Sequence, residues 1–134
     1  PCRRTGAWIM PDPREKPMPI DHKIDYVELP ARDFDAVERF FSDAFGWRFT
    51  DYGPDYRAFT DGVTDGGFYK ADASSSTGNG AALIVLYADD LETTRDAVLR
   101  CGGIVLKEIF PFPGGRRFHF ADPNGNELAV WSAN

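Results

Sequence analysis

The sequence predicts an α+β fold built from two βαβββ modules. The chain repeats itself once, with matching residues 57 positions apart, as Ala31 and Ala88 or Asp33 and Asp90 are. Each copy has a short apolar strand, an aspartate, a helical pattern and three strand-like segments separated by glycine and proline. Because one such module cannot easily bury both its helix and its sheet, we expect the two to pair within a single domain over residues 21–134.

The first module is expected over residues 23–73. The segment KIDYVEL reads as its first strand, and Asp33 is placed to cap the helix that follows. Apolar residues recur at helical spacing from Phe34 to Phe45, and Gly46 is suited to end this helix. Three more strands are predicted in the segments WRFTDY, YRAFTD and GGFYKA.

The second module is expected over residues 81–132, after the polar segment SSSTGNG (74–80), which reads as a flexible linker. Its first strand is AALIVLY, and Asp90 precedes a helix that runs to about Cys101 and ends at a pair of glycines. The segments IVLKEIF, RRFHFAD and NELAVW complete it, with the turn D-P-N-G between the last two.

Residues 1–20 are rich in proline and show no periodicity, so they predict an extended N-terminal arm rather than a domain. Two alternatives stay open for this arm. It packs on a partner chain through Trp8 and Ile9, or part of it is upstream or vector sequence, since Met18 reads like a natural start.

Composition and net charge limit the classes of partner and the cellular setting that we expect. A net charge of −6 argues against nucleic acid. The longest apolar run, AALIVLY, is far below the roughly 20 residues that span a bilayer, so no membrane segment is expected. Two cysteines, Cys2 and Cys101, do not make a disulfide framework, and we interpret them as typical of a reducing, cytoplasmic setting.

Two segments resemble a known family. DFDAVERFFSDAFGWRF is similar to the helix of the vicinal-oxygen-chelate superfamily, and ADPNGNELAVW resembles the last hairpin of that superfamily. The resemblance covers Lys23 to Ser132 and points to small bacterial proteins related to lactoylglutathione lyase. It implies the glyoxalase/bleomycin-resistance/dioxygenase fold, in which two βαβββ modules form a curved mixed sheet with a cleft. It also implies a homodimer.

The resemblance further implies where a metal ion would bind. Metal-dependent members place His, Gln or Glu in the first strand and Glu in the last strand of each module. The corresponding positions here are Tyr26, Leu83, Ala129 and a position near Phe68. Three of these side chains have no donor atom, a lone tyrosine makes no chelate, and Glu127 lies two residues too early. We therefore expect no divalent metal and no other cofactor.

Strand parity predicts which side chains line the cleft. The residues of opposite parity are apolar, as expected for the sheet face that packs under the helices. The predicted lining is aromatic and mixed in charge: Tyr26, Glu28, Tyr56, Phe68, Arg117, His119 and Trp131, with Leu83, Val85 and Ala129 as its floor. Such a surface suits a small organic ligand with a flat or apolar part.

His119 is the candidate general base of this cleft, with Glu28 or Glu127 as the neighbouring carboxylate. Plainer interpretations stay open. His119 is then a hydrogen-bonded strand residue, Glu28 a strand-end carboxylate or a partner of Arg117, and Trp131 a packing or dimer contact.

Three functions follow from these features. The first is binding of a small organic ligand without metal, as in bleomycin-resistance proteins. The second is a metal-independent lyase or isomerase that uses His119 with Glu28 as a catalytic pair. The third is a metal-dependent glyoxalase or dioxygenase, which the residues at the metal positions disfavour. The sequence favours the first over the second because it offers a cleft but no complete catalytic set, and it names no ligand.

Overall fold

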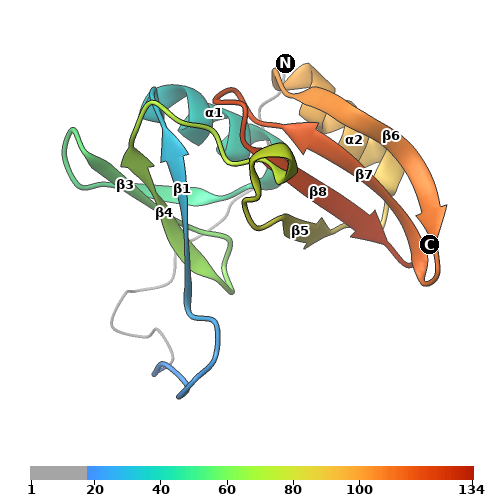
Figure 1. Ribbon diagram of the computed structural model, residues 1–134, viewed down its shortest axis with the longest axis horizontal. Helices are drawn as coiled ribbons and strands as arrows, with labels where there is room; N and C mark the ends of the chain where they lie inside the picture. The colour runs from blue at the N-terminus through green and yellow to red at the C-terminus, as the bar shows by residue number, and fades with distance from the viewer. Residues whose placement is uncertain (1–17) are drawn as a thin grey trace.

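A computed structural model describes residues 18–134 of the chain as two four-stranded sheets and two helices (Figure 1). The first sheet has the order β1-β4-β3-β2, and the second has the order β5-β8-β7-β6. The elements of the first half are β1 (Tyr26–Ala31), α1 (Phe34–Phe45), β2 (Arg48–Asp51), β3 (Tyr56–Thr60) and β4 (Asp65–Lys70). Those of the second half are β5 (Ile84–Tyr87), α2 (Leu91–Arg100), β6 (Ile104–Phe112), β7 (Gly115–Ala121) and β8 (Glu127–Ser132).

The two sheets share one topology. In each sheet the first strand pairs in parallel with the last, β1 with β4 and β5 with β8, while the remaining pairs are antiparallel. The α+β fold of two βαβββ modules is therefore confirmed. The proposed arm falls almost wholly on residues 1–17, which lie outside the described residues.

Both helices begin at the aspartates that the sequence singled out. The Asp33 carboxylate accepts a hydrogen bond from the backbone N–H of Ala36, and Asp90 accepts one from Thr93. Each bond satisfies a backbone donor that the first turn of a helix leaves unpaired. Helix α1 ends at Gly46, whose φ of 76° is the left-handed conformation that favours glycine.

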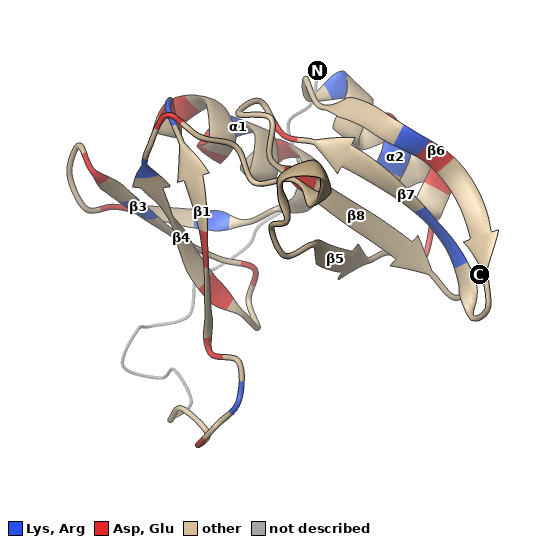
Figure 2. Cartoon of the chain, in the orientation of Figure 1, with Lys and Arg blue, Asp and Glu red and all other residues tan. Residues whose placement is uncertain are grey.

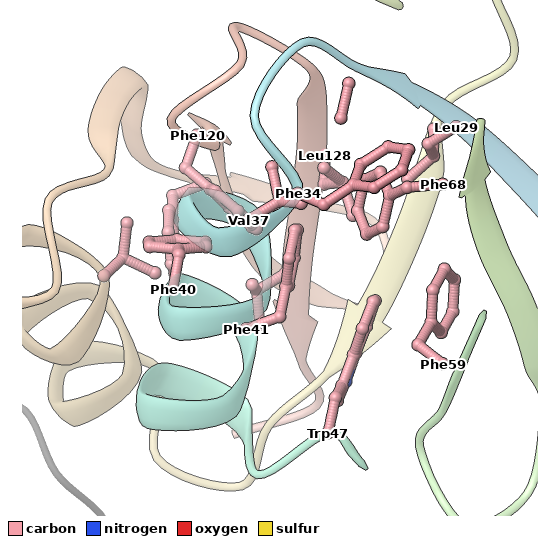
Figure 3. Packing of buried hydrophobic residues seen from close by; sticks show 14 of the residues in the cluster. Leu29, Phe34, Val37, Phe40, Phe41, Trp47, Phe59, Phe68, Phe120 and Leu128 are labelled. Carbon is pink, nitrogen blue, oxygen red and sulfur yellow. The ribbon is translucent and has the colours of Figure 1, made fainter. Parts of the chain in front are cut away.

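Helix α1 joins the two sheets through its phenylalanine side chains. Phe41 stacks on Trp47, with ring centroids 4.4 Å apart, and contacts Phe68 of the first sheet at 5.8 Å. The neighbouring Phe40 lies 5.9 Å from Phe120 of the second sheet. Figure 3 shows these rings on the two sides of one helix. A single hydrophobic core thus serves both modules, as the pairing of modules requires.

The turn D-P-N-G fixes the second module to the end of β1. The Asp122 carboxylate accepts hydrogen bonds from the backbone N–H groups of Asn124 and Asn126, at 2.8 and 2.9 Å. The side-chain amides of the two asparagines then donate to the carbonyl oxygen of Pro30. Burial raises the pKa of Asp122 to about 6, although the hydrogen bonds from Asn126 and Asn124 oppose the rise.

The segment 74–80 is structured, so the interpretation as a flexible linker is wrong. It contains a short 3₁₀ helix (Thr77–Asn79). The Ser75 N–H donates to the Asn126 side chain at 2.9 Å, and the Ser75 carbonyl accepts from the Glu127 N–H at 2.7 Å. The Ser74 hydroxyl also donates to the Asn124 carbonyl at 2.6 Å, so a side chain that suggested flexibility helps to hold the segment against the D-P-N-G turn.

The expectations about a membrane segment and about the cysteines have different outcomes. No helix within residues 18–134 is long and apolar enough to cross a membrane. Cys101 is disulfide-bonded, which disagrees with the interpretation of two unpaired thiols, while Cys2 lies outside the described residues. The cytoplasmic location stays a prediction, and the state of Cys101 removes the reasoning behind it.

The buried carboxyl of Asp122 predicts a pH dependence of stability. Its folded pKa of about 6 exceeds the ordinary 3.8, so the folded state binds the proton more tightly. The resulting stabilisation is full below about pH 4 and is lost as the pH rises to about 6. We expect the free energy of unfolding, relative to an Asp122→Asn variant, to fall by up to about 3 kcal/mol across this range. Urea unfolding of both proteins at pH 4, 5, 6 and 7 measures it, and a difference that does not change with pH would contradict the assignment.

Candidate functional site

Each sheet has one face against the helices and one turned away from them, which we call its open face. On β1, Leu29 and Ala31 are buried in the core, so Tyr26 and Glu28 lie on the open face. On β7, Phe118 and Phe120 are in the core, and the residues that alternate with them lie on the open face. The parity of these strands is as predicted.

Phe68 is not on the open face, and the prediction that it lines a ligand site is wrong. Its side chain is fully buried in the core against Phe41 and Phe59. The strand register places Gly67 opposite Glu28, so Gly67 occupies the open-face position that the sequence assigned near Phe68. The two adjacent glycines of GGFYKA hid this shift, because neither marks a face by its polarity.

The second sheet gathers most of its predicted site residues. His119 lies opposite Ala129, Arg117 opposite Trp131, and Ala129 opposite Val85 across three neighbouring strands. Ala129 is buried beneath this surface. Leu83 was predicted as part of the floor, but it precedes β5 and is only half-buried.

His119 and Glu127 form a buried pair on the second sheet. The His119 Nδ1 lies 2.8 Å from the Glu127 Oε2, and the two residues are only 5% and 7% exposed. The other oxygen of Glu127 accepts hydrogen bonds from the N–H and the hydroxyl of Thr77, at 2.9 and 2.8 Å. Burial favours a raised pKa for Glu127, but the hydrogen bonds from His119 and Thr77 outweigh it and lower the pKa to about 2.

Arg117 covers the other side of the histidine ring. Its Nη2 lies 3.0 Å from the His119 Nε2, and since arginine only donates, this nitrogen accepts. With Nε2 as the acceptor, His119 donates from Nδ1 to Glu127. The Arg117 guanidinium lies 5.9 Å from the ring centres of both Phe110 and Phe112. Within residues 18–134 no carboxylate pairs with Arg117, and its buried Nε has no hydrogen-bond partner.

Glu28 does not pair with His119, so its predicted role as the catalytic carboxylate beside that histidine is wrong. It accepts a hydrogen bond from the Tyr56 hydroxyl at 2.8 Å, and the Tyr26 and Tyr56 hydroxyls are also 2.8 Å apart. Burial, together with the bonds to Tyr26 and Glu28, raises the pKa of Tyr56 well above its ordinary value. The predicted site residues thus form two separate hydrogen-bonded groups, one on each sheet.

Sequence reasoning missed Thr77, Phe110 and Phe112. Thr77 sits in the segment interpreted as a linker, where a hydroxyl carries no sign of a buried partner. The register of β6 is irregular between Val105 and Phe110, so simple alternation could not assign the two phenylalanines to a face. The spacing Phe-Pro-Phe was the one available signal.

Comparison with known proteins agrees with this architecture. A model of the Glyoxalase/Bleomycin resistance protein/Dioxygenase superfamily matches residues 23–130. The chain belongs to this superfamily. A glyoxylase-like domain-containing protein of Didymella fabae is 30% identical over 127 residues, which cover 84% of this chain and 95% of the relative.

Solved structures share the fold of this chain at low sequence identity. A glyoxalase-related enzyme from Fulvimarina pelagi has a TM-score of 0.69 at 16% identity, over 83% of this chain and 88% of the other. The fosfomycin resistance protein FosX from Listeria monocytogenes has a TM-score of 0.70 at 13% identity, over 84% and 94%. At these identities the likeness establishes the fold and does not carry over an activity.

The metal positions that the resemblance implies lie on or next to four strands of the two sheets. They fall on Tyr26 and Gly67 in the first sheet, and on Leu83 and Ala129 at the second. The only donor atom among these side chains is the Tyr26 hydroxyl, which bonds to Tyr56. Across residues 18–134, no three His, Cys, Asp or Glu side chains are grouped so that they could hold a metal ion. Within the described part of the chain, the side chains at these four positions do not make a donor set that fits a divalent ion.

The Glu127 carboxylate predicts a loss of stability in acid. Its folded pKa of about 2 is below the ordinary 4.5, so it stabilises the fold above pH 4.5 and this contribution is lost as the pH falls toward 2. A Glu127→Gln variant must face its amide toward a donor of His119 or Thr77, and we expect it to lose about 1–3 kcal/mol at pH 7. This deficit should shrink at low pH.

Urea unfolding at pH 7, 5, 4 and 3 measures the Glu127 effect. A matched control is Glu108→Gln, which removes an exposed partner of Arg95 and should change stability by less than about 0.5 kcal/mol. A deficit of Glu127→Gln that is equal at pH 5 and pH 3 would show that the carboxylate is not held in its charged form.

Proposed function

We propose that this protein binds a small organic anion with a flat apolar part on the open face of the second sheet, without a metal ion. The observation that carries the proposal is Arg117. It is a half-buried cation that lies near two phenylalanine rings and has no carboxylate partner within residues 18–134. A guanidinium in such surroundings is suited to a carboxylate or phosphate ligand, since it presents several donors in one plane.

The neighbouring surface supplies the apolar contacts. Trp131 lies opposite Arg117 in the strand register, and its ring is 4.9 Å from Tyr87 and 6.1 Å from Phe112. The strand β5 carries no charged residue, and β8 carries only Glu127 (Figure 2). An anionic group at Arg117 would therefore place an attached ring against aromatic side chains.

The state of His119 supports binding over catalysis. Both of its ring nitrogens are engaged, Nδ1 by Glu127 and Nε2 by Arg117, so no lone pair is free to remove a proton. The runner-up is a metal-independent lyase or isomerase, which the His119–Glu127 pair supports. It requires that a bound anion draw Arg117 away and so free the Nε2.

Independence from metal is part of the proposal and rests on the donor set. The strand positions that bind metal in the superfamily carry one phenol and no imidazole or carboxylate. The nearest carboxylate on the second sheet, Glu127, is already bonded to His119 and Thr77. A homodimer, as the resemblance implies, stays a prediction.

Substitution of Arg117 and of its neighbour Arg116 should differ in the effect on ligand binding. Indole-3-acetate and phenylacetate are suitable probes, with their neutral amides as references. We expect Arg117→Gln to weaken binding of the carboxylates at least about tenfold, because a charge-assisted contact is worth about 1.5–3 kcal/mol. Arg116→Gln is the matched control, since Arg116 points to the other side of β7 and pairs with Glu92.

NMR titration of the labelled protein measures both the affinity and the place of binding. The expected shifts are at the backbone amides of Arg117, Trp131 and Tyr87. Equal binding of carboxylates and amides, or equal losses in the two arginine variants, would contradict an anion site at Arg117.

The metal prediction is tested on the same protein. We expect elemental analysis of the purified chain to find much less than one equivalent of divalent metal, and the binding of indole-3-acetate to be unchanged by EDTA. One bound equivalent whose removal abolishes binding would refute metal independence while leaving the role of Arg117 intact.

A further inference from the structure

We propose that the open face of the first sheet is a separate binding site for an organic cation, such as a quaternary or primary ammonium group, built from Glu28, Tyr26 and Tyr56. The inference does not rest on the anion site at Arg117. It concerns the other sheet, different strands and a ligand of opposite charge.

The site residues share one face of three adjacent strands. Tyr26 and Glu28 alternate with the core residues of β1, and Tyr56 alternates with Phe59 on β3. Tyr69 of β4 lies directly opposite Tyr56 in the register and adds a third aromatic ring to this face. The rings of Tyr26 and Tyr69 are accessible, since these residues are 42% and 41% exposed. Figure 1 shows β4 lying between β1 and β3.

Gly67 allows the three strands to form this site. A Cβ at Gly67 would lie 2.1 Å from the Tyr56 hydroxyl oxygen, which no real contact permits. The Tyr56 side chain therefore crosses β4 above Gly67 and reaches Glu28 and Tyr26 on β1. Tyr56 donates to the carboxylate and accepts from Tyr26, so the two hydroxyls fix the position of Glu28 without neutralising it.

Glu28 is a carboxylate with no basic partner in the described part of the chain. Within residues 18–134 its one recorded hydrogen bond comes from Tyr56, and no Lys, Arg or His pairs with it. The basic residues of β3 and β4 point to the helix side, where Arg57 binds Asp35 and Lys70 lies over Phe34. Arg48 belongs to β2, which β4 and β3 separate from β1.

A carboxylate beside aromatic rings favours one class of ligand. The faces of tyrosine rings attract cations, and a nearby carboxylate adds direct charge attraction. The Glu28 carboxylate would repel an anion, and a neutral apolar ligand would gain no charge attraction from it. The net charge of −6 also raises the local concentration of cations near the protein. These features together specify an organic cation, because a small hydrated ion would not use the rings.

Choline and its neutral isostere 3,3-dimethylbutan-1-ol test the proposal on the full chain. NMR titration follows the backbone amide of Gly67 and the ring protons of Tyr26 and Tyr56. We expect choline to shift these signals and the isostere to bind at least about tenfold more weakly. Sodium chloride at matched ionic strength is the control for simple screening.

Two variants separate charge from geometry. Glu28→Gln keeps an acceptor for Tyr56 but removes the charge, and we expect about a tenfold loss of choline affinity. Asp43→Asn removes one carboxylate from α1, on the other side of the sheet, and should leave choline binding unchanged. Gly67→Ala displaces Tyr56 while every polar group stays, and should also weaken binding.

Each outcome decides the proposal. Equal binding of choline and its isostere, equal losses in Glu28→Gln and Asp43→Asn, or shifts reproduced by sodium chloride would each overturn it. Arg117→Gln should still bind choline, so failure of the anion site and failure of the cation site are distinguishable.

Discussion

The packing of the α1 phenylalanines against both sheets is the contact on which the rest of this structure depends. Phe41 packs on the first sheet, and the adjacent Phe40 packs on Phe120 of the second. One helix therefore closes the core of both modules, and neither sheet could keep its position if this helix packed elsewhere. Because the helices occupy one face of each sheet, they leave the opposite faces uncovered. The locations of Glu28 and of Arg117 follow from this packing rather than from any local preference of their strands.

Polar contacts then decide what the second open face can do. The D-P-N-G turn fixes the start of β8, and the structured segment before β5 brings Thr77 to the Glu127 carboxylate. Glu127 is thereby held charged and in place, and it orients the His119 ring. The ring in turn presents its Nε2 to Arg117. A turn that looks purely structural thus determines the position of a cation on the surface, through a series of four hydrogen-bonded groups.

The two open faces differ in charge. Within residues 18–134, the first carries the Glu28 carboxylate among tyrosines with no basic partner, and the second carries the Arg117 guanidinium among phenylalanines and a tryptophan with no acidic partner. The positions at which the resemblance implies metal ligands carry a phenol, a glycine, a leucine and an alanine here. Under the proposed function, recognition of a ligand falls to aromatic rings and to single charges.

The sequence by itself determined the repeat, the two capping aspartates, the order of elements and the faces of most strands. These features are local, since a helix cap or an alternating strand is encoded by residues a few positions apart. Only the tertiary structure decided the partner of His119, the exclusion of Phe68 from the ligand face and the role of Thr77. Glu28 and Glu127 are equally plausible partners for a histidine in sequence, and the choice depends on which strands are neighbours. Similarly, a pair of glycines hides a shift of one residue, and a polar segment is flexible or fixed according to whether buried groups elsewhere in the chain complete its hydrogen bonds.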